Sequence, residues 1–302
     1  MQRKELELAD GRLYYEIRRG EAFGKAFGEA FIEEFRGQAS EVIVPATIEG
    51  FPVAGIGKKA FLSKKNIRRI VLPDTVGEVG EWAFAYCSGL EEVVLGSARV
   101  RFGRAAFLEC TALTKITLET EGFQPELLAA AVTSMDVFYL LELPAVGTKE
   151  WLEKWDARLM AILHTPDKSG YSKQVLCGEE DYGSTDLAAY MRRSRLKKAR
   201  LSFLRLLHPQ RLSERDRKEL ENFVLSHTKG CDTDEAWQVI LKEHGHEKAY
   251  YRFFAELGGV TKENLEAILA DIGEEYPEMK AYLLSSVGDE SQTEDFFSGL
   301  EL

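Results

Sequence analysis

Hydrophobic residues recur with a period of 23 between residues 56 and 118, and this period is the strongest structural signal in the chain. One phrase, an apolar residue, a glycine and then an Ala-Phe pair, begins at Ile56, Val79 and Phe102. An apolar ladder with L-x-x-I-x-L spacing follows each phrase: Ile67, Ile70, Leu72; Leu90, Val93, Leu95; and Leu113, Ile116, Leu118. A fixed period in the twenties predicts a solenoid of stacked copies, because no single copy can bury its own apolar face.

Each ladder is expected to form one strand of a narrow parallel sheet, with its apolar members pointing into the solenoid. The alternate positions then face solvent in two columns. These are a charged column of Arg69, Glu92 and Lys115, and a second column of Val71, Val94 and Thr117. An exposed apolar stripe on a sheet is a place where a peptide can lie, so these six are candidate binding residues. The alternative is that the charged column, which alternates in sign, only compensates itself across the strands.

The repeats share further positions that the fold must accommodate. One is a glycine, for which we expect a tight or left-handed turn: Gly57, Gly80 and Gly103. Another is held by Cys87 and Cys110 in successive repeats and by Lys64 in the first. Stacked strands lie ~4.8 Å apart, so the two thiols come near one another. We expect free thiols in a reducing compartment; a disulfide is the alternative and fits an exported protein.

Helical patterns follow the repeats. Residues 125–135 are expected to form a helical cap, because solenoid ends need covering. We expect residues 137–143 to form a short apolar element and residues 148–164 to form a helix. Residues 165–185 are expected to form a long loop or a junction between domains. The expected domains are a solenoid with an N-terminal cap over 1–145, an α-helical domain over 146–287 and an acidic disordered tail over 288–302.

The helical part contains a second repeat, in which residues 235–256 align without gaps on residues 263–284 at an offset of 28. Gly245 and Gly273 occupy equivalent places, each between two amphipathic stretches. Each unit therefore predicts a helix–turn–helix hairpin. Upstream, Ser213 predicts the N-cap of a helix that runs to about residue 227.

The repeated phrase, I-G-x-x-A-F-x-x-C-x-x-L-x-x-I-x-L-P, resembles the BspA-like (Treponema-type) leucine-rich repeat family. Residues 42–118 carry it, with Lys64 departing at the cysteine and Gly96 and Glu119 departing at the proline held by Pro73. The middle repeat matches at Gly80, Ala83, Phe84, Cys87, Leu90, Val93 and Leu95. The resemblance implies a right-handed solenoid used for protein or surface-glycan binding, in proteins that are often exported.

The two helical hairpins resemble ankyrin-type helix pairs, but they lack the finger signature that lies between such pairs. The expected fold class is thus α+β, a leucine-rich-repeat solenoid followed by an ankyrin-like helical domain.

Charge narrows the possible partners. The net charge is −11, which argues against nucleic acid and anionic membranes because phosphate would be repelled. The N-terminal residues lack the apolar core of a secretory signal, and no run of ~18 apolar residues predicts a membrane span.

One segment is basic although the whole chain is acidic. Residues 186–218 contain eleven basic and three acidic residues, a net charge of +8. The candidate docking residues there are Arg192, Arg193, Lys197 and Arg200, on a face expected to include Arg205. The alternative is a solvated helix paired with neighbouring acids.

Signals of catalysis are weak. His244 and His246, near Cys231, lack the C-x₂-C or H-x₃-H spacing of zinc sites, and Gly245 between them is explained by the hairpin turn. We therefore expect no enzyme activity, metal or cofactor. The expected function is a protein–protein interaction module or scaffold of a bacterial cytoplasm, with a protein or peptide partner. The alternative is a cell-surface adhesion or glycan-binding protein whose export signal is missing; an enzyme with a novel site ranks third.

Overall fold

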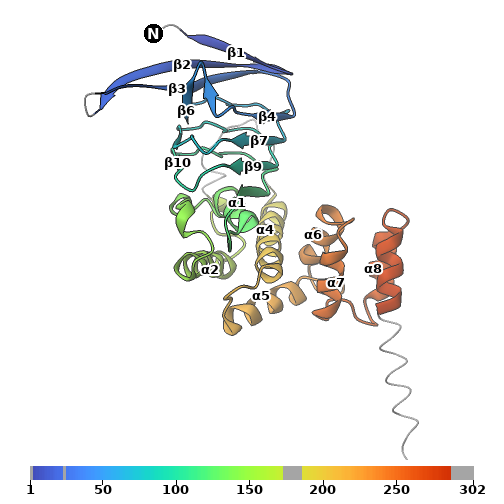
Figure 1. The fold of residues 1–302 in the computed structure, drawn as a ribbon. Coiled ribbons are helices and arrows are strands. Elements are labelled where there is room, and N and C mark those ends of the chain that lie inside the picture. The colour runs from blue at the N-terminus through green and yellow to red at the C-terminus, as the bar shows by residue number, and fades with distance from the viewer. Residues whose placement is uncertain (1–2, 23–24, 173–185, 287–302) are drawn as a thin grey trace, which may run out of the picture. The chain divides into compact units, whose positions relative to one another are not determined.

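The computed structural model describes residues 3–22, 25–172 and 186–286. The chain divides into two compact units, Met1–Arg158 and Leu159–Leu302 (Figure 1). The division lies inside helix α2 (Lys149–His164), not at the expected 145/146 boundary. The expected acidic tail lies outside the described residues.

The first half of α2 stays with the first unit because two indole rings tie it there. Trp151 Nε1 donates to the carbonyl of Leu140, and Trp155 Nε1 donates to the carbonyl of Leu127, each at 2.9 Å. Both tryptophans are buried. A boundary read from a break in the repeat cannot anticipate these contacts.

The first unit begins with an antiparallel ribbon rather than one short strand. Its strands are β1 (Lys4–Leu8), β2 (Gly11–Ala22) and β3 (Lys25–Gly37), and they pair in chain order. Alternation places Leu13 and Tyr15 in the core, with Phe35 of β3 beside them. The ribbon therefore starts the hydrophobic core that the repeats continue.

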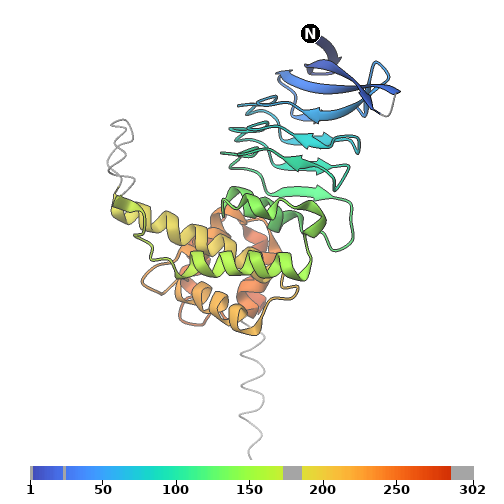
Figure 2. The same ribbon diagram turned by 90° about the vertical axis from the view of Figure 1, so that its left-hand side faces the viewer.

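The repeats form a solenoid with a sheet on each of two sides (Figures 1 and 2). The expected ladder strands lie in a four-stranded parallel sheet of order β11-β9-β7-β4, made of β4 (Glu41–Ile43), β7 (Arg69–Leu72), β9 (Glu92–Leu95) and β11 (Lys115–Leu118). The second sheet extends the ribbon through β6 (Phe51–Ile56), β8 (Glu78–Val79) and β10 (Arg101–Phe102), with β5 (Thr47–Ile48) paired to β6. The sequence pattern did not indicate this second sheet, because β8 and β10 have only two residues each.

A stack of phenylalanine rings fills the centre of the solenoid. Phe61, Phe84 and Phe107 come from the three repeated phrases, and Phe35 of β3 adds a fourth ring. Successive ring centroids lie 5.6, 5.4 and 5.5 Å apart, within the range of favourable aromatic contacts. The alanine and the phenylalanine of each repeated phrase are thus both buried.

The repeated glycine is required for a reason other than the left-handed turn that we expected. None of the three glycines of the phrase has a positive φ. The residue two positions after each glycine has one instead: Lys59, Trp82 and Ala105. A Cβ at Gly80 would lie 2.6 Å from the backbone nitrogen of Lys58 in the preceding coil. Glycine is required here because adjacent coils approach too closely for a side chain.

The two repeated cysteines are buried free thiols. Cys87 Sγ donates to the carbonyl of Phe61, and Cys110 Sγ donates to that of Phe84, each at 3.0 Å. Burial raises the pKa of Cys87 to about 11 and that of Cys110 to about 12. Each thiol thus serves as a neutral link between one coil and the coil before it.

The cap at the end of the solenoid follows the prediction. Helix α1 (Pro125–Thr133) packs against β11, and its leucines and alanines are buried. The apolar element after it is a pair of short 3-10 helices, η1 (Phe138–Leu140) and η2 (Leu143–Ala145). Helix α2 also matches its expected range.

The second unit is helical. Its helices are α4 (Leu187–Leu207), α5 (Glu214–Ser226), α6 (Glu235–Glu243), α7 (Lys248–Glu256) and α8 (Leu265–Ile272), and residues 277–286 are also helical. Ser213 caps α5 by accepting a hydrogen bond from the backbone of Asp216, as predicted. The repeated segments are helix–turn–helix hairpins, turning around Gly245 and Gly273, and Gly273 has φ 57°.

Candidate binding surfaces

The exposed face of the four-stranded sheet carries two rows of side chains in exact lateral register. One row, which we call the charged row, is Glu41, Arg69, Glu92 and Lys115. The other, the apolar row, is Ile43, Val71, Val94 and Thr117. Residues between them, such as Ile70, Val93 and Ile116, are fully buried. The predicted strand phase is therefore confirmed, and all six candidate residues of this face lie side by side.

The charged row is internally paired. Arg69 forms ion pairs with Glu41 and with Glu92, the latter at 2.8 Å between Nε and Oε2. Thr117 Oγ1 donates to Glu92 at 3.0 Å, and Lys115 Nζ lies 3.7 Å from Glu126 of α1. Partial burial alone would raise the pKa of Glu92, but the hydrogen bonds from Arg69 and Thr117 lower it on balance. The row compensates itself, as the alternative interpretation held.

The apolar row offers uncompensated surface. Ile43 is 58% exposed, and Val71 and Val94 are half-buried. Sequence reasoning missed Ile43 because the turn at 49–52 lengthens this repeat, so Ile43 lies 28 residues before Val71 rather than 23. The V-I-V-P segment that contains it was the signal that could have found it.

The basic helix α4 presents less free charge than its composition suggests. Arg192 and Arg193 are exposed, with the Arg193 guanidinium 6.0 Å from the ring centre of Tyr190. Arg200, however, forms a two-pronged pair with Glu243 at 2.6 and 2.7 Å. Lys197 is half-buried. Of the four candidate docking residues, only the first two are exposed and outside any ion pair found among the described residues.

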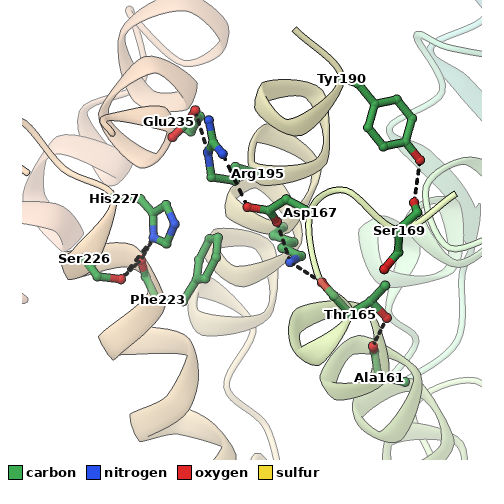
Figure 3. Close-up of polar contacts among 11 residues, drawn as sticks. Ala161, Thr165, Asp167, Ser169, Tyr190, Arg195, Phe223, Ser226, His227 and Glu235 are labelled. Carbon is green, nitrogen blue, oxygen red and sulfur yellow. Dashed lines mark hydrogen bonds and ion pairs between the residues drawn. The ribbon is translucent and has the colours of Figure 1, made fainter. Parts of the chain in front are cut away.

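Two other basic residues of α4 turn inward, and Figure 3 shows one of them, Arg195, between Glu235 and Asp167. Arg195 pairs with Glu235 at 2.8 Å and with Asp167 at 3.4 Å. Lys198, which is 5% exposed, donates to Asp167 at 2.7 Å and to the carbonyl of Thr165 at 2.6 Å. Buried charges of this kind need partners, so these residues belong to the structure of the helical unit.

Arg205 does not lie on the expected exposed face. It is fully buried, and its guanidinium donates to the backbone carbonyls of His208, the C-cap of α4, and of Gln210 in the turn that follows. Donors at a helix C-terminus satisfy carbonyls that have no partner within the helix. Arg205 is therefore a capping residue.

The histidines near the first hairpin have structural partners. His244 Nδ1 lies 2.8 Å from Glu247, and its ring stacks on Tyr250 with centroids 3.6 Å apart. His246 meets the ring of Tyr276 edge-on at 4.8 Å. Across residues 3–22, 25–172 and 186–286, no three His, Cys, Asp or Glu side chains gather in a metal-binding arrangement. Within the same residues, no helix has the length and apolar character required to span a bilayer.

Comparison with known families bears on the solenoid. The model of a BspA type leucine rich repeat region (6 copies) matches residues 40–124. Residues 40–124 are a BspA-type leucine-rich repeat region. Repeats of this family suggest a protein-interaction module. No curated protein matches the chain, and the likeness of the hairpins to ankyrin pairs stays a prediction.

Three solved structures resemble part of the chain. A leucine rich repeat protein of T. pallidum is 26% identical over 33% of this chain and 46% of its own, with a TM-score of 0.29. A leucine rich cell surface protein from Faecalibacterium prausnitzii A2-165 is 25% identical over 38% and 32%, with a TM-score of 0.30. A leucine-rich repeat protein from Bacteroides ovatus ATCC 8483 is 30% identical over 36% and 28%, with a TM-score of 0.27. The chain spans less than half the length of each.

Proposed function

We propose that this protein is a non-catalytic interaction module that binds an extended peptide across the β4-β7-β9-β11 sheet. The observation that carries the proposal is the apolar row, in which an exposed Ile43 and the half-buried Val71 and Val94 lie in register. The charged row beside them needs no external partner. Apolar side chains aligned on a rigid sheet gain free energy when a ligand covers them.

The dimensions of the face indicate how a peptide would lie. Four strands at ~4.8 Å spacing give a surface about 14 Å across, which an extended peptide crosses with about four or five residues. Alternate peptide side chains, about 7 Å apart, would then point down onto the apolar row. The Arg69 and Glu92 side chains flank that path and can fix the register of polar neighbours in the peptide.

The test is a selection of random peptides against the full chain, followed by affinity measurements on variants. Val94→Lys places a charge in the centre of the apolar row and should weaken selected peptides roughly tenfold or more, since a buried valine contributes about 1.5–3 kcal/mol. Ser88→Lys adds the same charge at an exposed position of the same repeat and should leave binding unchanged. Selected peptides that bind Val94→Lys as tightly as the unmodified chain would refute the proposal.

The basic helix is the second candidate surface, on the strength of the exposed Arg192 and Arg193. The double variant Arg193→Glu, Lys197→Glu should weaken binding less than Val94→Lys does. If the double variant alone removes binding, the helical unit is the functional half. Exposed charges are screened within ~8 Å at physiological ionic strength, so binding there would also decline steeply with salt.

We further propose that the protein works in a bacterial cytoplasm. The buried thiols support this location, because neither Cys87 nor Cys110 needs an oxidised partner for its packing. Alkylation of protein taken directly from cells, without reductant, should find both residues as thiols by peptide mass spectrometry. A Cys87–Cys110 crosslink in that sample would favour the cell-surface alternative instead.

A further inference from the structure

A polar cavity of about 540 Å³ opens at the first repeat, away from the sheet face described above. One wall is the turn that carries Lys58, Lys59 and Lys64, and the other is the ribbon, with Glu16, Glu33 and Arg3. The aliphatic side chain of Leu62 lies in the cavity lining. No aromatic ring is among the described residues that line it.

The cavity exists because the coil stacked on the first repeat is shortened. The backbone of Gly57 donates to Ile32, and the backbone of Phe35 donates to Ala60, in the same pattern that joins the later coils. In this pattern Ile32 is equivalent to Ile56 of the next coil, and Phe35 is equivalent to Phe61. Three positions separate Ile32 from Phe35, whereas five separate Ile56 from Phe61. The shortened coil therefore lacks two residues before its phenylalanine.

The same coil is also shorter after its phenylalanine. Six positions separate Phe35 from Glu41 of β4, whereas eight separate Phe61 from the paired Arg69 of β7. The residues that this coil lacks are those that would cover two corners of the turn in the first repeat. One corner is Lys58–Lys59 and the other is Leu62–Lys64. These two corners are the parts of the turn that line the cavity.

Lys64 is the residue that the repeat pattern leaves unexplained. In the next two coils its place is taken by Cys87 and Cys110, which are buried and bonded to the coil before them. Lys64 instead is half-buried at the cavity, where a complete coil would have required a small neutral side chain. A charged group at this place is compatible with the fold only because the cavity is open.

The acidic residues of the ribbon wall are already neutralised. Glu34 receives hydrogen bonds from Arg36 and Arg3, which hold its pKa at about 2. Glu16 and Glu33 both pair with Arg18, the latter at 3.1 Å. These carboxylates remain able to accept hydrogen bonds from hydroxyl groups, but they do not cancel the charge of the opposite wall.

The lysine wall retains free positive charge. Lys58 is paired with Glu81 at 2.7 Å. Lys59 lies over the ring of Trp82 at 4.8 Å. Within the part of the chain that the structure describes, no carboxylate lies within ion-pair distance of Lys59 or Lys64. The Lys59 ammonium also helps to lower the pKa of Glu81, so it is directed at the next coil. Lys64 is thus the lysine of this wall whose charge is left for the cavity, opposite the carboxylate acceptors of the ribbon.

We propose that this cavity binds a small hydroxylated carboxylate of the sugar-acid class, with the ligand carboxylate at Lys64 and its hydroxyls at Glu16 and Glu33. The ammonium group of Lys64 selects an anion. The facing acceptors select hydroxyl donors, and the lack of a ring in the lining disfavours flat aromatic anions. The site is independent of the peptide surface, which lies on the other sheet.

The test is saturation-transfer NMR on the full chain with D-glucuronate as the probe, beside D-glucose and acetate. Glucuronate should bind, and both of the simpler compounds should bind more weakly, because each has only half of the required groups. Lys64→Met, which keeps length and removes charge, should weaken glucuronate about tenfold or more, as expected for a charge-assisted hydrogen bond. Lys59→Met should weaken glucuronate less than Lys64→Met does, because the Lys59 ammonium lies over Trp82.

Lys65→Met is the matched control, because Lys65 is adjacent in sequence, exposed and outside the cavity lining. It should leave the affinity for glucuronate unchanged. Unaltered urea midpoints would show that the variants are folded. Absence of binding to the unmodified chain, equal binding of acetate and glucuronate, or equal losses in Lys64→Met and Lys65→Met would each overturn the assignment.

Discussion

Truncation of the central ring of the phenylalanine stack should destabilise the solenoid strongly. Phe84 is fully buried, with Phe61 at 5.4 Å on one side and Phe107 at 5.5 Å on the other. Phe84→Ala should lower the free energy of unfolding by about 3–5 kcal/mol. The loss should fall toward the upper end of that range, because two ring contacts of about 0.5–1.5 kcal/mol each disappear together.

The neighbouring rings cannot move in to fill the space. Their backbones are held at the coil spacing by hydrogen bonds from Phe61 to Ala83 at 2.8 Å and from Phe84 to Ala106 at 2.9 Å. A cavity that the surroundings cannot close is the costly case of a large-to-small substitution.

The assay is urea unfolding monitored by tryptophan fluorescence in a Trp237→Phe background. Trp82, Trp151 and Trp155, which all lie in the first unit, then report on that unit alone. With a slope of about 2 kcal/mol per molar urea, the midpoint should fall by about 1.5–2.5 M. Phe138→Ala, at a position 40% exposed in the same unit, should change it little. An unchanged midpoint for Phe84→Ala, or an equal loss for Phe138→Ala, would show that the ring stack does not hold the solenoid together.

Two further predictions test the coil spacing and the ribbon. Gly80→Ala should destabilise by about 1–3 kcal/mol, because the nearest obstruction to its Cβ is backbone, whereas Gly77→Ala, with its nearest atom 3.9 Å away, should stay within about 0.5 kcal/mol in the same urea assay. The pKa of Glu34 is lowered to about 2 by Arg36 and Arg3, so its charge stabilises the fold above its unfolded pKa of about 4.5 and this contribution is lost as pH falls toward 2. The midpoint difference between the unmodified chain and Glu34→Gln should therefore be largest near neutral pH and vanish near pH 2; a difference that does not shrink would contradict this pairing.

The sheet face was predictable because its residues repeat with the period of the solenoid. Once the ladders fix which side of each strand is buried, the alternate residues must face out, and equal spacing places Val71 beside Val94. Prediction failed at Ile43, where an altered loop length shifts the period while β4 still pairs in register with β7.

The basic helix shows the opposite case. Its composition indicated a positive surface, yet composition does not say which side chains meet acids from distant segments. Arg195 meets Glu235 forty residues later, and Lys198 meets Asp167 thirty-one residues earlier. Such pairs depend on how helices pack, which a local charge count does not contain.

The sequence by itself determined the stacked coils of this protein, because the apolar ladders, the Ala-Phe pairs and the cap residues can bury their surfaces in only one repeating arrangement. The tertiary structure alone decided why Gly80 must be glycine and why Lys64 can be charged. Both depend on the distance to the coil before them, which closes to 2.6 Å between a Gly80 Cβ and the Lys58 backbone. The same coil stacking opens into a cavity above Lys64, where the preceding coil is shortened. A local pattern specifies each coil, but the spacing between coils is set by residues that are far apart in the chain.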